Sequence, residues 1–335
     1  MKKQWFSALL ALALLLGMAC GCAAPGEDVS GEENGLGVIL EDMGVPLGGL
    51  PPAGFVLNPS ASGTSVEKND FAEIDYSNAK DGYVMVRWTG GGSPKIMVVI
   101  KGPTYTPQEK NQYQYYLRTD GEYDVLPLSD GNGEYNITVH KNISGTKYST
   151  VLSASVNAQL TDEFAPFLRP NQYVNFTEDS EVVSMAQSLI SAKEAETGTA
   201  LDNLGKVGLV YEWVVTNLTY DFNRAKTVQP GYLPDVDSVM AEKKGICFDY
   251  AALMASMLRS QGVPVKLVVG YTSQGVYHAW INVWSEEGGW VEGMIYFDGK
   301  IWKLMDPTYA SSGKQSNSIM QFINNSANYK EKYFY

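Results

Sequence analysis

The first patterned stretch of the chain alternates between apolar and polar residues with a period of two, which is typical of half-buried β-strands. Glycine-rich turns, such as residues 90–92 and 130–133, separate the alternating runs. The predicted strands cover residues 83–88, 96–100, 113–117, 123–126, 134–140 and 150–156. Six or seven short strands at this spacing predict that residues 69–160 form an immunoglobulin-like β-sandwich.

From about residue 161 onward the apolar residues change their spacing, and both helices and strands are predicted. Two helices are expected at 182–195 and 204–218, and Asp202 is expected to cap the second. A third helix is expected to begin near Cys247, because apolar residues recur at helical spacing until Gly262. Strands are then expected at 265–271, 277–284, 289–291, 294–297 and 301–305. This order predicts an α+β domain over residues 161–335.

Cys247 is the only cysteine outside the first 22 residues, and it lies where the third helix is expected to begin. A helix N-terminus presents unpaired N–H groups and a partial positive charge, which lower a thiol pKa and favour the nucleophilic thiolate. Lys243 and Lys244 add positive charge just upstream. The same N–H groups could stabilise an oxyanion. The alternative is a structural cysteine, because free cysteine is often buried.

A thiol nucleophile needs a base to accept its proton and a third group to orient that base. His278 lies on a predicted strand, and Asp306 follows the last predicted strand. Asp306 on an adjacent strand could hold the imidazole ring while the other ring nitrogen faces the thiol. Taken singly, His278 could be a packed residue and Asp306 a turn residue. A zinc site is disfavoured because closely spaced ligand pairs are missing, so no metal or cofactor is expected.

Four segments of the second half resemble the transglutaminase-like superfamily. They are Gly-Ile-Cys-Phe-Asp-Tyr-Ala at 245–251, Gly-Val-Pro-Val-Lys-Leu-Val-Val-Gly-Tyr at 262–271, His-Ala-Trp-Ile-Asn-Val at 278–283 and Asp-Pro-Thr at 306–308. The resemblance covers about residues 175–320. It implies a papain-like core, in which a cysteine on a helix packs against strands that carry histidine and aspartate.

The resemblance also implies a role for each matching residue. Cys247 would be the nucleophile, His278 the base and Asp306 the group that orients the base. Tyr220 would line the site or stabilise the oxyanion. Trp280 would line the site, with a structural role as the alternative.

Active members of this superfamily share one half-reaction, in which a thiolate attacks an amide carbonyl, an amine leaves and a thioester forms. We therefore expect an enzyme that acts on amide bonds of proteins or cell-wall peptides. Hydrolysis is favoured over cross-linking, because water is abundant and no acceptor site is apparent in the sequence. The alternative is a catalytically inactive binding or adhesion module built on the same fold.

The N-terminus has the pattern of a processing signal. Two lysines precede the apolar run 8–16, and small residues then lead to Cys20 and Cys22. The run is too short to span a bilayer permanently, and a cysteine after small residues resembles the lipobox of bacterial lipoproteins. Residues 1–22 are therefore predicted to be a lipoprotein signal and lipidation region, with Cys20 slightly favoured over Cys22. An ordinary secretory signal is the alternative.

Residues 23–68 are rich in glycine, proline, serine and acidic residues and are predicted to be a flexible tether. We expect a lipid anchor in the cell membrane, with the protein on the extracytoplasmic face. The formal net charge of −12 disfavours nucleic acid, so the expected partners are a protein or peptide substrate and, through the lipid, the membrane. Tyrosines at 113, 115, 116 and 123 suggest a sugar- or peptide-binding face, although tyrosine is also favoured in strands generally.

Overall fold

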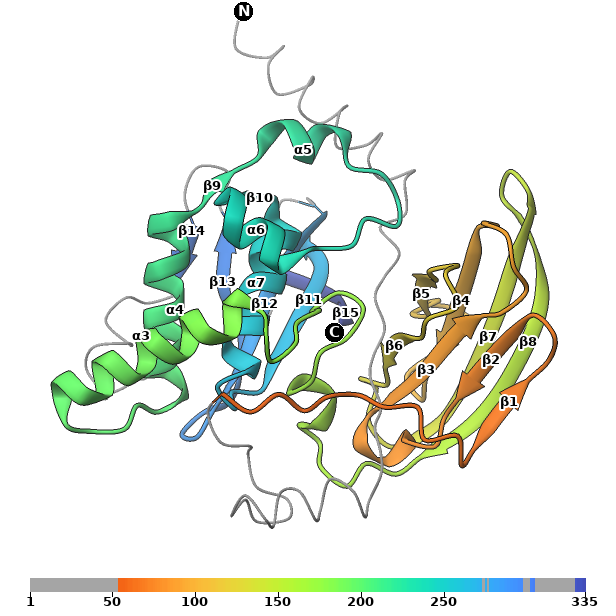
Figure 1. The fold of residues 1–335 in the computed structure, drawn as a ribbon, viewed down its shortest axis with the longest axis horizontal. Coiled ribbons are helices and arrows are strands. Elements are labelled where there is room, and N and C mark those ends of the chain that lie inside the picture. The colour runs from red at the N-terminus through yellow and green to blue at the C-terminus, as the bar shows by residue number, and fades with distance from the viewer. Residues whose placement is uncertain (1–53, 273–274, 276, 298–301, 305–328) are drawn as a thin grey trace, which may run out of the picture.

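The computed structural model describes residues 54–272, 275, 277–297, 302–304 and 329–335 of the 335-residue chain. The expected signal segment with Cys20 and Cys22, and also Asp306, lie outside these residues. No helix within the described part of the chain is long and apolar enough to cross a membrane. This part forms a β-rich half and an α+β half that lie side by side (Figure 1).

The β-rich half consists of two four-stranded antiparallel sheets. The first contains, in spatial order, β1 (Val66–Lys68), β2 (Ala72–Asp75), β3 (Tyr83–Trp88) and β6 (Asp124–Pro127). The second contains β5 (Tyr113–Tyr116), β4 (Ile96–Lys101), β7 (Gly133–Ser144) and β8 (Lys147–Ala158). Residues from both sheets, such as Ile74, Val86, Val98 and Ile137, are buried in one shared core. All six strands predicted from the alternating pattern are present.

The sequence predicts a tether up to residue 68, but residues 54–68 pack against the folded body. Val56 and Leu57 are buried, and the Gly54 N–H donates to the Ser260 carbonyl at 2.6 Å. β1 pairs with β2 and forms the edge of the first sheet. The apolar pair at 56–57 and the three residues of β1 are too short to give an alternating pattern. The predicted boundary therefore falls after the first strand.

The α+β half is built on a five-stranded antiparallel sheet in the order β14-β13-β12-β11-β15. Its strands are β11 (Val265–Thr272), β12 (Tyr277–Ser285), β13 (Gly289–Phe297), β14 (Trp302–Leu304) and β15 (Tyr329–Phe334). Its helices are α3 (Glu181–Thr197), α4 (Asn203–Asn217), α5 (Phe222–Thr227), α6 (Val236–Glu242) and α7 (Cys247–Arg259). A short parallel pair, β9 (Thr219–Tyr220) and β10 (Lys244–Gly245), completes it. The two strands predicted at 289–291 and 294–297 are one strand, β13.

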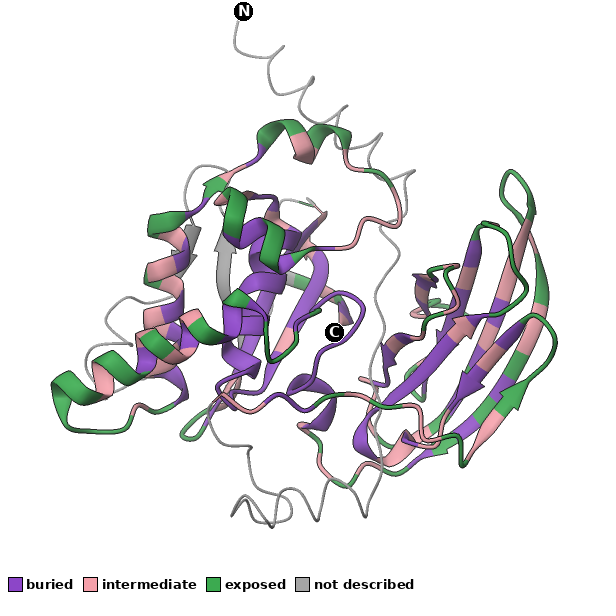
Figure 2. Ribbon diagram, in the orientation of Figure 1, coloured by how far each residue is buried: buried purple, intermediate pink, exposed green. Residues whose placement is uncertain are grey.

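The predicted third helix, α7, is the central helix of this half. Every residue from Phe248 to Arg259 is buried, and the helix contacts β11, β12, α3, α4 and α6 (Figure 2). It ends at Arg259, and Gly262 then takes a left-handed conformation (φ 74°) just before Pro264, close to the end that the sequence predicts. The Asp202 cap of α4 is confirmed, because its side chain accepts a hydrogen bond from the Gly205 N–H at 2.7 Å. The site is therefore built on a helix that is fixed on several sides.

The two halves meet at an aromatic cluster beside β15. The ring centroid of Tyr113 in β5 lies 5.5 Å from that of Tyr333 and 5.8 Å from that of Tyr335. The Ser129 hydroxyl donates to the Phe334 carbonyl at 2.6 Å. The last strand of the five-stranded sheet therefore also forms part of the contact with the β-rich half.

This contact overturns part of the predicted tyrosine binding face. Tyr113 and Tyr115 are buried, and Tyr115 packs against Tyr173 with ring centroids 6.1 Å apart. Their alternation along β5 points them into the core, and large aromatic side chains stabilise a core more than they do a solvated face. Tyr116 and Tyr123 are half-buried beneath cations, with Lys95 over the first ring and Arg87 over the second.

Candidate active site

Cys247 is the first residue of α7. The preceding residue, Ile246, has an extended backbone, and its N–H donates to Asp249 Oδ2 at 2.8 Å. Cys247 is half-buried, and it forms no disulfide within the part of the chain that the structure describes. The thiol therefore lies at the positive end of a buried helix and remains partly accessible, which is a setting that favours the thiolate.

Tyr220 lies directly against Cys247. It pairs with Gly245 in the parallel β9–β10 ladder. Gly245 lies two residues before Cys247 in the sequence. The Tyr220 hydroxyl oxygen accepts a hydrogen bond from the Cys247 N–H and is also hydrogen-bonded to the thiol. Burial and then the Cys247 charge raise the pKa of Tyr220 above its ordinary value. The phenol therefore stays protonated at neutral pH and can donate a hydrogen bond to a thiolate or an oxyanion.

His278 lies on β12, opposite Gly270 of β11. Its side chain is buried, and burial lowers the pKa of His278 to about 4. The imidazole is therefore neutral at pH 7 and can accept a proton. Its Nε2 has no hydrogen-bond partner among the residues that the structure describes. Since β12 packs against α7, the strand that carries His278 contacts the helix that begins at Cys247.

Trp280 is fully buried on the same strand. A Cβ atom added to Gly270 would lie 2.9 Å from its ring, so the indole packs directly on the backbone of the neighbouring strand. This position favours the structural role that the sequence left open for Trp280. Asp306, predicted to orient the imidazole, lies outside the described residues and stays a prediction.

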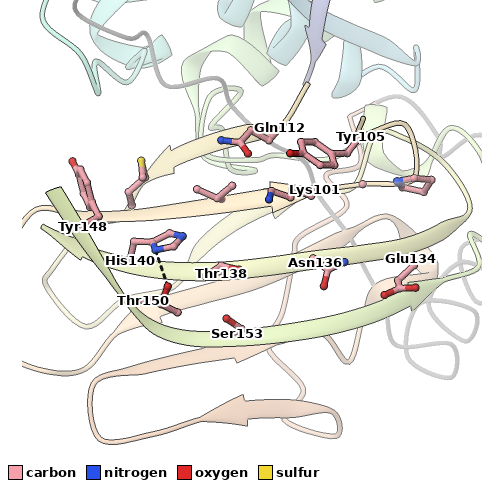
Figure 3. Close-up of a pocket in the computed structure, with 14 residues that line it drawn as sticks. Lys101, Tyr105, Gln112, Glu134, Asn136, Thr138, His140, Tyr148, Thr150 and Ser153 are labelled. Atoms are coloured by element: carbon pink, nitrogen blue, oxygen red, sulfur yellow. Dashed lines mark hydrogen bonds between the residues drawn. The ribbon is translucent and has the colours of Figure 1, made fainter. Parts of the chain in front are cut away.

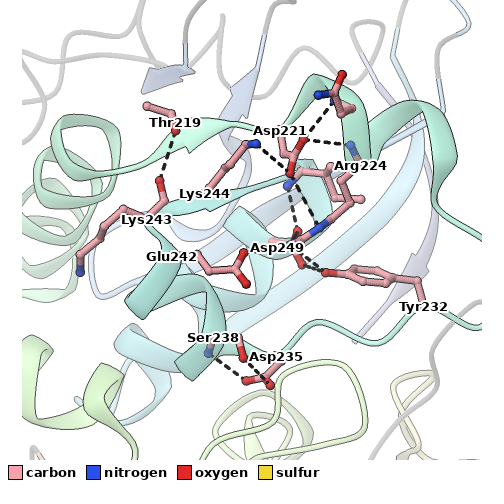
Figure 4. Close-up of polar contacts among 12 residues, drawn as sticks. Thr219, Asp221, Arg224, Tyr232, Asp235, Ser238, Glu242, Lys243, Lys244 and Asp249 are labelled. Carbon is pink, nitrogen blue, oxygen red and sulfur yellow. Dashed lines mark hydrogen bonds and ion pairs between the residues drawn. The ribbon is translucent and has the colours of Figure 1, made fainter.

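A buried carboxylate connects the start of α7 to the segment that precedes it (Figure 4). Asp249 is fully buried, and its Oδ1 accepts a hydrogen bond from the Tyr232 hydroxyl at 2.6 Å. Its Oδ2 accepts from the Ile246 N–H at 2.8 Å and from Arg224 Nη1 at 3.5 Å. Burial raises the pKa of Asp249, although these hydrogen bonds act against the shift. Two residues after Cys247, this side chain therefore fixes the loop around Tyr232.

Several polar contacts hold α5 in place. Asp221 caps the helix by accepting hydrogen bonds from the N–H groups of Asn223 and Arg224. Lys244 Nζ lies 3.3 Å from Asp221 Oδ2, and Arg224 Nη2 donates to Glu242 at 3.1 Å (Figure 4). The hydrogen bond from Arg224, helped by Lys244, lowers the pKa of Asp221. No residue of α5 is buried, so this helix adds little to the core.

α5 also carries an unusual surface residue. Phe222 is 56 % exposed, and its ring centroid lies 5.0 Å from that of Tyr220. The Tyr220 hydroxyl contacts Cys247. Tyr220 therefore links the exposed Phe222 ring to the candidate nucleophile in space.

Sequence reasoning missed Arg224, Tyr232 and Phe222. The one local signal was Asp221, which is a good N-cap residue just after the Tyr220 motif. Tyr232 lies in a segment without periodicity and reaches Asp249 across 17 residues, so no spacing rule indicates the contact.

The family model described as Transglutaminase-like superfamily matches residues 190–293. The chain carries a domain of this superfamily. The matched stretch includes Tyr220, Cys247 and His278 and ends before Asp306. The transglutaminase-like domain has the fold of a cysteine enzyme, as the motifs predict.

Sequence relatives match only parts of the chain. A protein-glutamine gamma-glutamyltransferase of Pseudomonas aeruginosa is 31% identical over 86 residues, which are 22% of this chain and 11% of that protein. A UPF0252 protein of Methanocaldococcus jannaschii is 25% identical over 175 residues, covering 48% of each. The chain thus spans less than half the length of these curated relatives. Among solved structures, the transglutaminase of red sea bream is 12% identical with a TM-score of 0.29, over 70% of this chain and 49% of that one.

Proposed function

We propose that the protein is a transglutaminase-like cysteine enzyme that acts on amide bonds of proteins or cell-wall peptides, with hydrolysis as the main outcome. The observation that carries this proposal is the position of Cys247. It is a half-exposed thiol at the first residue of a buried helix, and a protonated Tyr220 hydroxyl lies against it. The name of the Pseudomonas relative, a protein-glutamine gamma-glutamyltransferase, supports a protein or peptide amide as the substrate.

In the proposed reaction, neutral His278 accepts the Cys247 proton, and the thiolate attacks the amide carbonyl. The N–H groups at the start of α7 and the Tyr220 hydroxyl donate hydrogen bonds to the oxyanion. The imidazolium then returns its proton to the nitrogen as the C–N bond breaks, which releases an amine and leaves a thioester. Water attacks the thioester while His278 accepts its proton, and the carboxylic acid leaves as the thiol is restored. Asp306 is proposed to accept a hydrogen bond from the other ring nitrogen of His278.

Phe222 is proposed to contact the substrate beside the scissile amide. Its ring is exposed, packs on Tyr220 and lies on a helix that has no buried residue. An apolar or aromatic residue next to the scissile bond would bury this ring on binding. The proposed preference is therefore for peptides with an apolar residue at that position.

We further propose that the protein is exported and lipid-anchored through Cys20 or, second, Cys22, on the extracytoplasmic face of the membrane. The charged, apolar and small-residue leader motivates this proposal. Intact-mass measurement of the protein from membrane fractions tests it. A mature N-terminus without lipid would contradict the anchor.

An immunoglobulin-like topology is proposed for the β-rich half. The orders β2-β3-β6 and β5-β4-β7-β8 support it, because the chain passes from one sheet to the other after β3, β5 and β6. Such crossings are typical of Greek-key sandwiches.

Labelling with iodoacetamide at graded pH tests the chemistry. The Cys247 peptide is quantified by mass spectrometry in the parent protein, in His278→Gln and in Tyr220→Phe. We expect labelling to rise with a midpoint well below the ordinary thiol pKa of about 8.5. Tyr220→Phe should move that midpoint upward, because the thiolate loses a hydrogen-bond donor, whereas His278→Gln, which removes a neutral ring, should move it little. A midpoint at the ordinary value that Tyr220→Phe does not move would refute a catalytic thiolate.

Reaction in ¹⁸O-labelled water with and without a primary amine separates hydrolysis from transfer. Hydrolysis places ¹⁸O in the acid product in both conditions. Predominant amine adducts would show that transfer is the main outcome.

A further inference from the structure

The outer face of the second sheet of the β-rich half has an open hollow of about 990 Å³ (Figure 3). Its floor includes His140, Thr138 and Asn136 in a row on β7, and Tyr148 and Tyr105 stand at opposite ends of that row (Figure 3). None of these side chains takes part in the proposed chemistry. They alternate with residues such as Val139 and Ile137, which are buried in the shared core.

The strand register explains why the face is hollow. Thr138 pairs with Val99 of β4 on one side and with Ser153 of β8 on the other. Three short side chains therefore meet in the middle of the sheet. The longer side chains of Lys101 and Tyr148 lie toward the ends of the row (Figure 3). Short side chains in the floor, flanked by long side chains, produce a depression although the sheet itself is continuous.

The hollow carries little net charge at neutral pH. Burial lowers the pKa of His140, so its imidazole is neutral, and its Nδ1 lies 3.3 Å from the Thr150 hydroxyl. Lys101 and Glu134, the charged residues that line the hollow, have opposite signs. The chain as a whole has a net charge of −12, which disfavours an anionic polymer as the ligand. The lining therefore matches an uncharged ligand.

The spacing of the two tyrosines matches an extended ligand. Tyr148 pairs with Asn142 of β7, whereas Lys101, whose Nζ lies 4.7 Å from the Tyr105 ring centroid, pairs with Asn136. Positions 142 and 136 are separated by roughly 20 Å along an extended strand. That distance exceeds the size of a single sugar ring or amino acid.

Between the tyrosines, the floor offers hydrogen-bonding groups of both kinds. Asn136 Oδ1 accepts a hydrogen bond from Ser155 at 3.0 Å, which leaves the amide N–H groups of Asn136 for a ligand. Thr138 adds a hydroxyl that can donate or accept. A ligand that is rich in hydroxyl groups and has apolar ring faces would use both the floor and the tyrosines.

We propose that this hollow binds a neutral oligosaccharide, with sugar rings against Tyr105 and Tyr148 and hydroxyl groups bonded to Asn136, Thr138 and His140. The proposal does not depend on the chemistry at Cys247. Binding of a surface glycan would raise the effective concentration of amide substrates attached to the same material.

Isothermal titration of the detergent-solubilised mature protein tests the proposal, with chitotetraose, cellotetraose and maltotetraose as probes. We expect saturable binding of at least one tetrasaccharide. The double variant Tyr105→Ala/Tyr148→Ala should raise Kd at least tenfold while the thermal unfolding temperature stays close to that of the parent. Phe71→Ala is the matched control, because Phe71 is an exposed aromatic residue (49 %) next to the first sheet.

Three outcomes would overturn the proposal. The first is that no tetrasaccharide binds, and the second is that the double variant binds as tightly as the parent. The third is that a cell-wall stem tetrapeptide competes for the same hollow and the sugars do not. If the double variant unfolds, Ser153→Arg replaces it, since this exposed position on β8 would fill the hollow from its edge.

Discussion

At the scale of single residues, the site depends on two environments that differ in burial. Cys247 is half-buried at a helix N-terminus, whereas His278 is buried on a strand, where desolvation keeps its imidazole neutral. A neutral base paired with a thiol that is readily ionised is the combination that the proposed nucleophilic catalysis requires. The positions of both residues, one at the start of a helix and one on a strand, could be predicted from the sequence because each lies on a well-patterned element. Their polar neighbours could not, because those contacts join segments without periodicity.

Removal of either the nucleophile or the base should abolish turnover. We expect Cys247→Ala and His278→Gln each to lower kcat by at least about 10³-fold without loss of fold, and Asp306→Ala to leave partial activity. The kcat of the double variant Cys247→Ala/His278→Gln should be no lower than that of the less active single variant, because the two residues act as one unit. Steady-state kinetics with circular dichroism as the folding control provide the measurement. Turnover by a folded Cys247→Ala protein would end the proposal.

Burial of His278 also predicts how stability depends on pH. Its pKa is about 4 in the folded protein, whereas the ordinary pKa of histidine is 6.5, so below pH 6.5 the unfolded chain binds a proton that the folded chain does not. The unfolding free energy should therefore fall by about 3 kcal/mol from this residue alone between pH 7 and pH 4. Urea unfolding of the parent and of His278→Gln should diverge over this window, with the variant losing less stability.

The other histidine provides the matched control for this experiment. His140 is half-buried in the β-rich half, so His140→Gln should change the pH dependence much less. Parallel stability curves for the parent and His278→Gln would show that His278 does not titrate as described.

At the scale of elements, α5 differs from the other helices of the α+β half. The others bury an apolar face, whereas α5 buries none and is fixed by Asp221, Arg224 and the carboxylates that Arg224 reaches. Six residues are too few for a helical pattern to be recognised, and for this reason the sequence did not predict α5. A short helix that is fixed by polar contacts beside the candidate nucleophile and adds little to the core is suited to contact substrate.

Phe222→Ala should therefore change specificity more than chemistry. For a peptide with an aromatic residue next to the scissile amide, we expect KM to rise roughly tenfold, because burial of the ring contributes on the order of 1.5 kcal/mol or more. The rate of iodoacetamide labelling at Cys247 should be unchanged. Phe71→Ala is again the control and should alter neither quantity. An equal loss for substrates with and without the aromatic residue would contradict a substrate contact at Phe222.

At the scale of the whole molecule, the two halves are less independent than the sequence suggests. The strands of the β-rich half and the helices and strands around Cys247 could be predicted, because each has clear periodicity and turn residues. The aromatic contact between the halves could not, because a tyrosine such as Tyr113 has the same alternation whether it faces solvent or another domain. β15 was missed as well, since its residues Tyr329–Phe334 show no alternation that separates them from a loop.

Tyr113→Ala should therefore destabilise both halves together. Tyr113 is buried against Tyr333 and Tyr335, and truncation of a buried aromatic side chain costs about 3–5 kcal/mol. Differential scanning calorimetry should show one transition at lower temperature for the variant. Phe71→Ala, which removes an exposed ring of similar size, should shift the transition little. Unfolding of the β-rich half alone, with the α+β half unaffected, would show that the contact is not structural.

The hydrogen bond between Ser129 and Phe334 joins residues that are 205 positions apart in the chain. A contact of this separation forms only after the entropy of closing a very long loop has been lost, and such contacts slow folding far more than local ones. Completion of the five-stranded sheet by β15 should therefore be the late event in refolding. Until then the chain would have a structured β-rich half and a sheet with an open edge along β11, the state in which it is most exposed to aggregation and proteolysis.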